Sequence, residues 1–463
     1  MKLEITLQDF QAVFFKMEEE EDLFSRRMSD GTYYWDIVRC QVYLYLHSLH
    51  GGPFEQPESP SDQTLSNKLR NIVKWAINKI TLNYLIKCRP KYIFVTGQRI
   101  KIGASLIDNI SDHLFELMKD EASAIELMNR KSISYWALIF GIKTRVPPVA
   151  VLTKNIKSEI QDVLNYIENL IKKYFFISVD AYKIIYEPII CFRVNKAYYA
   201  KLLSKHNPNV IICINNGTLN GMFSAAKESK IPTIELQHGA SNSNTIFWSY
   251  PSSVSSSHPG LSLPTAYLTF SNFWNTNINY PVKFLDYIGN NYFYQRKIIG
   301  SNDGVLIISA YMYREELLQL VLELATSEKN KTIYYKLHPH EFSERDNVIF
   351  KFSRYENIYV ICDEMDFPSL YKKCNYVIGI HSTTLYMALQ AGKKVCIYKR
   401  SNYFWHIDIF NYVELFDSAT ELRDVMCDSK GKYFKNFSRV PVFFRPFDAD
   451  RFMNALSVVG RCI

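Results

Sequence analysis

The residues of this chain that could do chemistry gather directly after its most strand-like runs. Lys336, His338 and Pro339 follow the run 332–335, which is rich in aromatic and β-branched residues. A His at the end of a strand, held by the Pro that follows it, is placed to donate a hydrogen bond to a phosphate. Lys336 adds positive charge beside it. A histidine that only caps its strand is the alternative interpretation.

A second segment places hydroxyl groups at the start of a helix. The apolar run 377–380 is followed by His381, Ser382, Thr383 and Thr384, and then by a helical pattern. An ordinary helix cap explains one hydroxyl. Three hydroxyls after a His, at a helix start with its free N–H groups, favour phosphate binding.

A third segment carries a candidate general base. Gln237, His238 and Gly239 follow the strand-like run 231–236, and Glu235 lies within it. His238 can take a proton from a hydroxyl because the pKa of imidazole lies near neutral pH, and the Gly permits close approach. Glu235 is the second catalytic candidate, although strand alternation puts it on the face opposite His238 if the strand continues. A turn with a buried His is the plain alternative.

Asn215 and Asn216 end the preceding strand-like run, 209–214, just before a Gly. If the two strands pair in parallel, both Asn side chains lie on the same sheet edge as His238. We therefore count Asn215, Asn216, Gln237 and Gly239 as candidate acceptor or cleft residues. A simple turn explains the Asn pair equally.

Familiar cofactor and metal fingerprints are absent. The chain contains no P-loop sequence and no G-x-G-x-x-G dinucleotide fingerprint. Its nine cysteines are scattered without a C-x-x-C pair, which argues against a zinc site or a disulfide framework. We expect a site with no metal and no cofactor.

The composition indicates a globular protein with two domains. The 463 residues, 48% of them hydrophobic, exceed one ordinary core. No run reaches the roughly 18 apolar residues of a membrane span, and charges interrupt the N-terminal segment, so we expect a cytoplasmic protein. A net charge of +8 suits phosphorylated substrates or anionic lipid heads, or reflects a merely basic surface. Since the basic residues form no single block, we expect no nucleic-acid partner.

The order of elements predicts an α/β fold. A strand–helix–strand pattern over 209–236 and strict alternation from 303 to 398 both indicate parallel sheets. Helical patterns precede them at 1–90 and 153–206, and Trp35, Asp36 and Arg39 share a helix face that we interpret as structural, with an ion pair. The predicted divisions are an N-terminal domain over 1–295, a C-terminal α/β domain over 296–445 and a final helix over 446–463.

The motifs and their order resemble those of GT-B glycosyltransferases, in which two Rossmann-like domains face each other. Leu337-His338-Pro339 together with the segment 379–384 is similar to the paired His-Pro and Ser/Thr motifs of bacterial sialyltransferases and polysialyltransferases. The same motifs resemble capsule Kdo transferases and the CDP-glycerol polymerases of teichoic acid synthesis. Gln237-His238-Gly239 resembles the His-Gly element of several of these surface-polysaccharide enzymes. The resemblance covers roughly residues 205–400 and does not extend to the first 200.

The resemblance implies a role for each matching residue. His238 would be the base. The donor's phosphate would contact His338, the Pro339 backbone, Ser382 and Thr383. Many GT-B enzymes also carry a Glu in the last helix that holds a ribose or sugar hydroxyl, and this chain departs from them with Met387 in that place.

Three functions fit these observations. The first is an inverting, metal-independent glycosyltransferase that moves a sugar from a nucleotide-activated donor to a capsule or lipopolysaccharide glycan, with a CMP-linked donor favoured. The nucleotide-sugar would be a substrate rather than a cofactor, bound by 296–445, and the acceptor would bind 1–295. The second is a polyol-phosphate transferase with a CDP-linked donor. The third is a non-catalytic polysaccharide assembly protein.

The expected partners are a nucleotide-sugar donor and a glycan or lipid-linked glycan acceptor. A basic protein that acts on lipid-linked acceptors would sit peripherally on the inner membrane face, with the lysine-bearing helices of 153–206 as the contact. Solvated helix faces explain the same lysines without a membrane.

Overall fold

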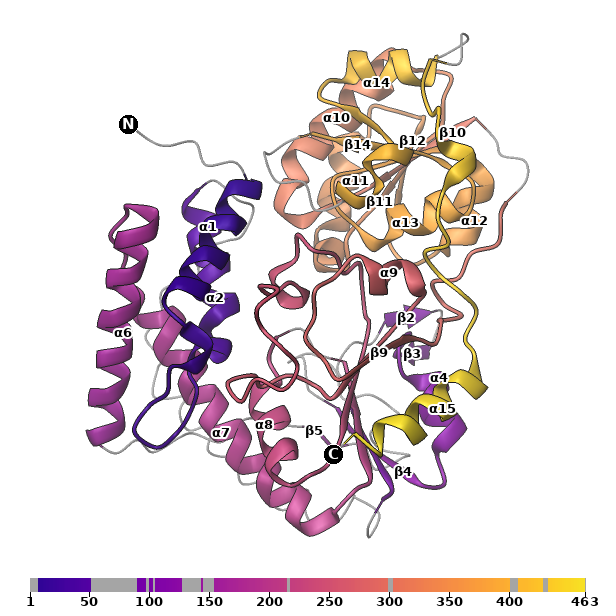
Figure 1. The fold of residues 1–463 in the computed structure, drawn as a ribbon. Helices are drawn as coiled ribbons and strands as arrows, with labels where there is room; N and C mark the ends of the chain where they lie inside the picture. The colour runs from indigo at the N-terminus through magenta and orange to yellow at the C-terminus, as the bar shows by residue number, and fades with distance from the viewer. Residues whose placement is uncertain are drawn as a thin grey trace.

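The computed structural model shows a mixed α/β protein with one parallel sheet in each half of the chain (Figure 1). A group of helices from the N-terminal half flanks the first sheet. The structure describes residues 7–50, 90–96, 100–102, 105–126, 143–144, 154–214, 217–298, 303–399, 407–427 and 432–462. The predicted α/β class, with two Rossmann-like domains and a helical N-terminal extension, is confirmed.

The N-terminal extension consists of amphipathic helices that bury one face each. In α1, Phe10, Phe14 and Met17 recur at helical spacing and are almost fully buried. The helices are α1 (Leu7–Glu20), α2 (Trp35–Leu49), α6 (Lys154–Phe175) and α7 (Tyr182–His206), with the short 3₁₀ helix η1 (Leu23–Ser25). None of the described helices is both long enough and apolar enough to cross a membrane.

The first sheet has seven parallel strands in the order β5-β4-β1-β6-β7-β8-β9. Its central strands are buried on both faces, which is why they read as continuous apolar runs in the sequence. The strands are β1 (Tyr92–Thr96), β4 (Ala122–Glu126), β5 (Lys143–Thr144), β6 (Val210–Cys213), β7 (Thr233–Leu236), β8 (Ala266–Thr269) and β9 (Phe284–Tyr287). The predicted parallel pairing of the strands on either side of residues 217–229 is confirmed.

Helices and a hairpin complete the N-terminal half. The helices that follow its strands are α4 (Asp112–Met118), α8 (Asn220–Glu228) and α9 (Asn272–Thr276), with η2 (Ile246–Trp248) inside the long loop after β7. The antiparallel hairpin pairs β2 (Ile100–Ile102) with β3 (Ser105–Ile107).

The second sheet has six parallel strands in the order β12-β11-β10-β13-β14-β15. In chain order this is the 3-2-1-4-5-6 arrangement of a Rossmann fold. The strands are β10 (Gly304–Ile308), β11 (Ile333–Lys336), β12 (Ile358–Ile361), β13 (Cys374–Gly379), β14 (Lys394–Tyr398) and β15 (Glu414–Phe416). The topological switch point therefore lies between β10 and β13.

The connecting helices alternate with these strands, as predicted. They are α10 (Arg314–Ser327), α11 (Arg345–Phe352), α12 (Phe367–Lys373), α13 (Thr383–Gln390) and α14 (Ala419–Met426), with the 3₁₀ helices η3 (Tyr311–Tyr313), η4 (Pro339–Glu344), η5 (Ile407–Tyr412) and η6 (Phe437–Arg439). The predicted division at residue 295 falls between β9, the last strand of the first sheet, and β10.

The last segment of the chain returns to the first domain. Helix α15 (Ala449–Val459) packs near β9, and the Arg451 guanidinium forms an ion pair with Asp286 of that strand (Figure 1). The backbone N–H of Asp448 donates to the carbonyl of Ile288 at 2.8 Å. The segment before the predicted final helix therefore crosses from the second domain to the first, and the helix packs against the first domain.

A buried ion pair ties the N-terminal extension to the long loop after β7. The Arg39 Nε lies 2.5 Å from the Glu18 carboxylate, and both side chains are fully buried. Arg39 also donates to the carbonyls of Ile246 and Ser249 at 2.8 Å each. The structural interpretation of this helix face is confirmed, but the ion partner of Arg39 is Glu18 from outside the predicted cluster. Asp36 instead accepts hydrogen bonds from the Tyr250 hydroxyl and the backbone N–H of Ser262.

We predict that Arg39→Met destabilises the protein strongly. The change leaves Glu18 as an unpaired buried charge and two carbonyls without their donor, a loss of about 3–5 kcal/mol. The measurement is the free energy of unfolding in urea. Lys351→Met, which breaks the exposed pair with Glu315, is the control and should cost less than about 1 kcal/mol. Equal effects of the two variants would contradict the role given to Arg39.

Candidate functional site

The loop after β7 touches the start of α13 in the opposite domain. The backbone N–H of Ala240 donates to the Thr383 hydroxyl at 2.9 Å. A Cβ on Gly239 would lie 3.3 Å from the same hydroxyl, so a side chain there would crowd this contact. The structure thus brings the predicted base loop and the predicted phosphate turn together.

His238 sits in this loop as a neutral imidazole. Burial lowers its pKa from 6.5 to about 4. Its Nδ1 is buried and has no hydrogen-bond partner among the described residues, while its ring lies 5.7 Å from that of Trp248. At neutral pH the ring is therefore free to accept a proton, as a general base must.

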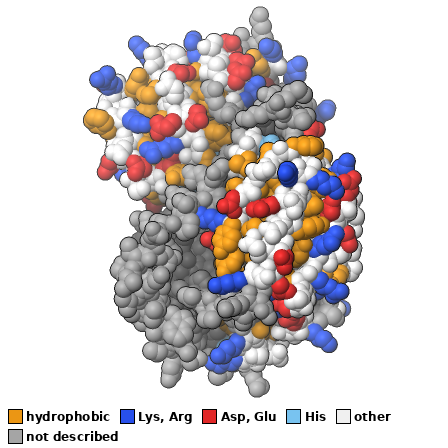
Figure 2. All heavy atoms as spheres, turned by 90° about the vertical axis from the view of Figure 1, so that its left-hand side faces the viewer, with side chains coloured by type: hydrophobic (Ala, Val, Ile, Leu, Met, Phe, Trp, Pro, Cys, Tyr) orange, Lys and Arg blue, Asp and Glu red, His pale blue; other side chains and the backbone are white. Residues whose placement is uncertain are grey.

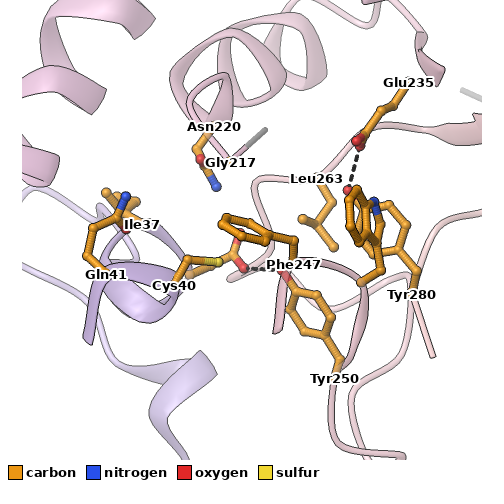
Figure 3. Close-up of a pocket in the computed structure, with 12 residues that line it drawn as sticks. Ile37, Cys40, Gln41, Gly217, Asn220, Glu235, Phe247, Tyr250, Leu263 and Tyr280 are labelled. Carbon is orange, nitrogen blue, oxygen red and sulfur yellow. Dashed lines mark hydrogen bonds between the residues drawn. The ribbon is translucent and has the colours of Figure 1, made fainter. Parts of the chain in front are cut away.

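Glu235, the second catalytic candidate, is bonded within the interior of the first domain. Its carboxylate is 1% exposed and accepts a hydrogen bond from the Tyr280 hydroxyl at 2.8 Å. It lines a cavity of ≈ 20 Å³ between the first sheet and α2, with Cys40 and Gln41 on the side of α2 (Figure 3). The cavity has room for about one water molecule. Because β7 continues as a strand through Leu236, the pleat turns Glu235 toward the helical extension.

Gln237 is committed to holding the loop. Its Nε2 donates to the Gly239 carbonyl at 2.8 Å and to the Ser241 hydroxyl at 2.9 Å. Its Oε1 accepts from the backbone N–H of Phe270, the residue after β8. With its side chain 1% exposed, Gln237 positions the loop from within the domain and does not face a cleft as predicted. Asn215 and Asn216, which follow β6, lie outside the described residues.

His338 caps the 3₁₀ helix η4 through its ring Nδ1, so Nε2 takes no part in the cap. The ring Nδ1 accepts from the backbone N–H of His340 at 3.3 Å. The backbone N–H of His338 donates to the buried carboxylate of Glu341 at 2.8 Å. Since burial lowers the pKa of His338, the ring is neutral and its proton must lie on Nε2. The capping bond thus sets the tautomer that can donate to a phosphate, with Pro339 exposed at the first position of η4.

Lys336 points away from the predicted phosphate position. Its ammonium donates to the carbonyl of Cys362, at the end of the neighbouring strand β12. It also lies 5.1 Å from the centroid of the Phe342 ring. Burial lowers the pKa of Lys336. These contacts give Lys336 a structural role in this state of the protein.

The turn before α13 lies at the switch point of the second sheet. The Ser382 hydroxyl accepts from the backbone N–H of Thr384 at 3.1 Å and so caps the helix. Thr384 is buried, and its carbonyl accepts from the Tyr371 hydroxyl. Burial lowers the pKa of His381 to about 4, and a proton on the nearby His338 ring would lower it further. Switch points are where open α/β sheets bind ligands.

Sequence reasoning missed a cluster next to this turn. The Asp408 carboxylate in η5 accepts from the Tyr386 hydroxyl in α13 and from the Asn242 amide in the first domain. Burial raises the pKa of Asp408 to about 6. No motif could have found the cluster, because its members come from three separate segments. Met387, which replaces the Glu expected from the motif resemblance, is 2% exposed and belongs to the core.

Within the described residues, no group of three or more His, Cys, Asp or Glu side chains is arranged to hold a metal ion. Nucleotide binding in the presence of EDTA tests the prediction that the reaction needs no metal.

We predict that His238 titrates far below an ordinary histidine. Its ring resonances in NMR spectra should move with a midpoint near the pKa of about 4 that burial produces, rather than near 6.5. The signal is assigned by its loss in His238→Gln. Because the unfolded state then binds more protons than the folded state between these values, this group removes stability as the pH falls through that window. A midpoint near 6.5 would show that water reaches the ring freely.

Comparisons with known proteins give likenesses of structure alone. No protein-family model matches the sequence, and no curated protein does. A UDP-GlcNAc 2-epimerase from Neisseria meningitidis bound to UDP-GlcNAc aligns over 79% of this chain and 99% of its own, at 12% identity and a TM-score of 0.47. MurG from Acinetobacter baumannii aligns over 80% and 99%, at 9% identity and a TM-score of 0.46. A glycosyltransferase from Rickettsia africae aligns over 80% and 99%, at 10% identity and a TM-score of 0.44. With TM-scores below 0.5, these likenesses do not decide the activity or substrate of this chain.

Proposed function

We propose that this protein is an inverting glycosyltransferase that uses a nucleotide-activated sugar. The contact between Ala240 and Thr383 carries the proposal, because it places the loop that contains His238 against the turn of the other domain that we predict to bind phosphate. An acceptor hydroxyl and a sugar phosphate bound at these two edges would meet between them. The acceptor we propose is a growing capsule or lipopolysaccharide glycan, as the motif resemblance implies.

The donor side would bind the nucleotide phosphate through neutral groups. The His338 Nε2–H and the Ser382 and Thr383 hydroxyls are hydrogen-bond donors near the switch point of the sheet, at the N-terminal end of α13. Such preorganised donors stabilise the negative charge that the phosphate gains as its bond to the sugar breaks.

The acceptor side would supply the base. The acceptor oxygen attacks the anomeric carbon, the bond from that carbon to the phosphate oxygen breaks with its electron pair, and the hydroxyl proton passes to His238. An imidazole with a pKa of about 4 is a weak base on its own. A phosphate that becomes more negative nearby raises the pKa of the imidazole, so its proton affinity increases as the reaction proceeds.

The membrane contact of the helical extension stays a prediction. On the face that α1 and α6 present, basic and acidic side chains are interspersed rather than gathered by sign (Figure 2). This mixture of charges does not favour contact with an anionic membrane, so the proposed function rests on the site between the domains.

We predict that His338→Asn lowers kcat by a factor of about a hundred or more, since removal of one preorganised donor has an effect of that size. Asn keeps a side-chain acceptor for the cap of η4, so this variant separates phosphate binding from capping. The readout is the rate of sugar transfer. The matched control is His340→Ala, which keeps the backbone N–H of the cap and removes an exposed ring that meets the His338 ring edge-on at 5.0 Å, so the effect of losing this ring contact is measured separately. Near-normal rates in His338→Asn would reduce His338 to a helix cap.

We predict that CMP raises the melting temperature of the purified protein in the presence of EDTA. A ligand that binds only the folded state stabilises it by mass action, and EDTA tests whether binding needs a metal. The panel is CMP, CDP, UDP and GDP at equal concentration. A shift with CDP alone would favour polyol-phosphate transfer, and one with UDP or GDP alone would move the donor search to ordinary hexoses. With no shift for any nucleotide, the non-catalytic assembly protein becomes the better reading.

A further inference from the structure

The loop that carries His238 is held from the opposite domain at a second point. Asn242, four residues after His238, donates through Nδ2 to the Asp408 carboxylate at 3.1 Å. The same carboxylate accepts from the Tyr386 hydroxyl at 2.8 and 3.0 Å. Asp408 thus joins the base loop of the first domain to the helix that begins at Thr383.

The orientation of the Asn242 amide is fixed by its other bonds. Its Oδ1 accepts from the backbone N–H of Asn244 and from the Thr245 hydroxyl, each at 3.1 Å. An amide whose oxygen is occupied in this way presents its nitrogen, a donor, to the remaining partner. Asn242 is 2% exposed, and Asp408 accepts a hydrogen bond from its buried amide group.

The surroundings of Tyr386 make this a contact between domains. The Tyr386 ring is fully buried and lies 4.9 Å from the Trp274 ring of α9, in the first domain. It also lies 5.1 Å from Phe443 in the segment that returns to the first domain. The Tyr386 ring, which donates to Asp408, is therefore packed against aromatic rings of the first domain and of the segment that returns to it.

Two hydrogen bonds hold the loop against the second domain. The Gln237 side chain holds the loop within its own domain, and the bond from Ala240 to Thr383 is its first contact with α13. The bond from Asn242 to Asp408, two residues further on, adds a second contact with the opposite domain. Since hydrogen bonds to charged groups are stronger than neutral ones, Asp408 is the firmer of the two anchors.

We propose that Asp408 is a positioning residue that anchors the loop 238–242 to α13 and so sets the distance between His238 and the phosphate turn. Its consequence for catalysis rests on the function proposed above, whereas the anchoring itself does not. Reacting groups must be held closely in place for efficient transfer, so a loosened loop lowers the rate without removing a reacting group.

Hydrogen exchange followed by mass spectrometry tests the anchor without any substrate. In Asp408→Ala, backbone amides of residues 238–245 should exchange about tenfold faster or more, as expected when a bond to a charged acceptor is lost. Asp408→Asn keeps a carbonyl acceptor and should restore most of the protection. Asp303→Ala is the control, because Asp303 is an exposed Asp of the same domain that is paired with Lys331. It should leave the loop unchanged.

Asn242→Asp tests the same contact from the first domain. The change keeps the oxygen that organises the turn and replaces the donor by a second carboxylate, which repels Asp408. It should release the loop as Asp408→Ala does, and it supports the anchor even if Asp408→Ala does not fold. Unchanged exchange of 238–245 in Asn242→Asp, or an equal rise across all strands of the second sheet in Asp408→Ala, would overturn the proposal.

Kinetics then separate the anchor from the reaction. Asp408→Ala should lower kcat about tenfold or more while KM for the donor changes by less than about threefold, because the loop positions the base and does not bind the nucleotide. A normal kcat with a released loop would overturn the catalytic part of the proposal. If the wild-type protein transfers no sugar, the proposed function fails, yet the exchange experiment still decides the anchor.

Discussion

The rest of the structure depends on one meeting of two sheet edges, where the backbone N–H of Ala240 donates to the Thr383 hydroxyl. Parallel strands expose their carboxyl ends at one edge, so each domain on its own gathers polar loops there. A site that uses groups from both domains exists only if those two edges face each other closely. A net contribution of about 1 kcal/mol from one hydrogen bond cannot fix that relation alone.

Other features of the chain hold the two edges in place. The segment after residue 440 returns to the first domain and ends in α15, whose Arg451 pairs with Asp286 of β9. The buried pair of Glu18 and Arg39 holds the long loop after β7 through the carbonyls of Ile246 and Ser249. This loop contains His238. The helical extension therefore holds the loop within the first domain, while Thr383 and Asp408 hold it from the second domain.

The sequence predicted the sheets well because parallel strands are buried on both faces. Runs such as 210–213 and 305–308 are apolar without alternation, and polar motifs mark where they end. The same logic located His238, His338 and Ser382, which follow strand ends directly. It could not say which way Glu235 faces or that the Lys336 ammonium is bound to a backbone carbonyl, because both depend on the neighbours that tertiary packing supplies. Asp408 could not be found for the same reason.

The electrostatics of the site follow from its burial. The protein carries a net charge of +8, yet the candidate phosphate-binding groups near the meeting point are hydroxyls and imidazoles whose pKa values burial lowers, and the charged group described there is the Asp408 carboxylate. A buried cation without a partner would be costly, and Lys336 avoids this cost by bonding to Cys362. Neutral donors can line a closed site before any ligand arrives. In the proposed function, a bound phosphate would raise the pKa of each imidazole, so the site would gain positive charge only with a negative group present to stabilise it. Burial of the imidazoles would therefore let the charge of the proposed site respond to the phosphate that it binds.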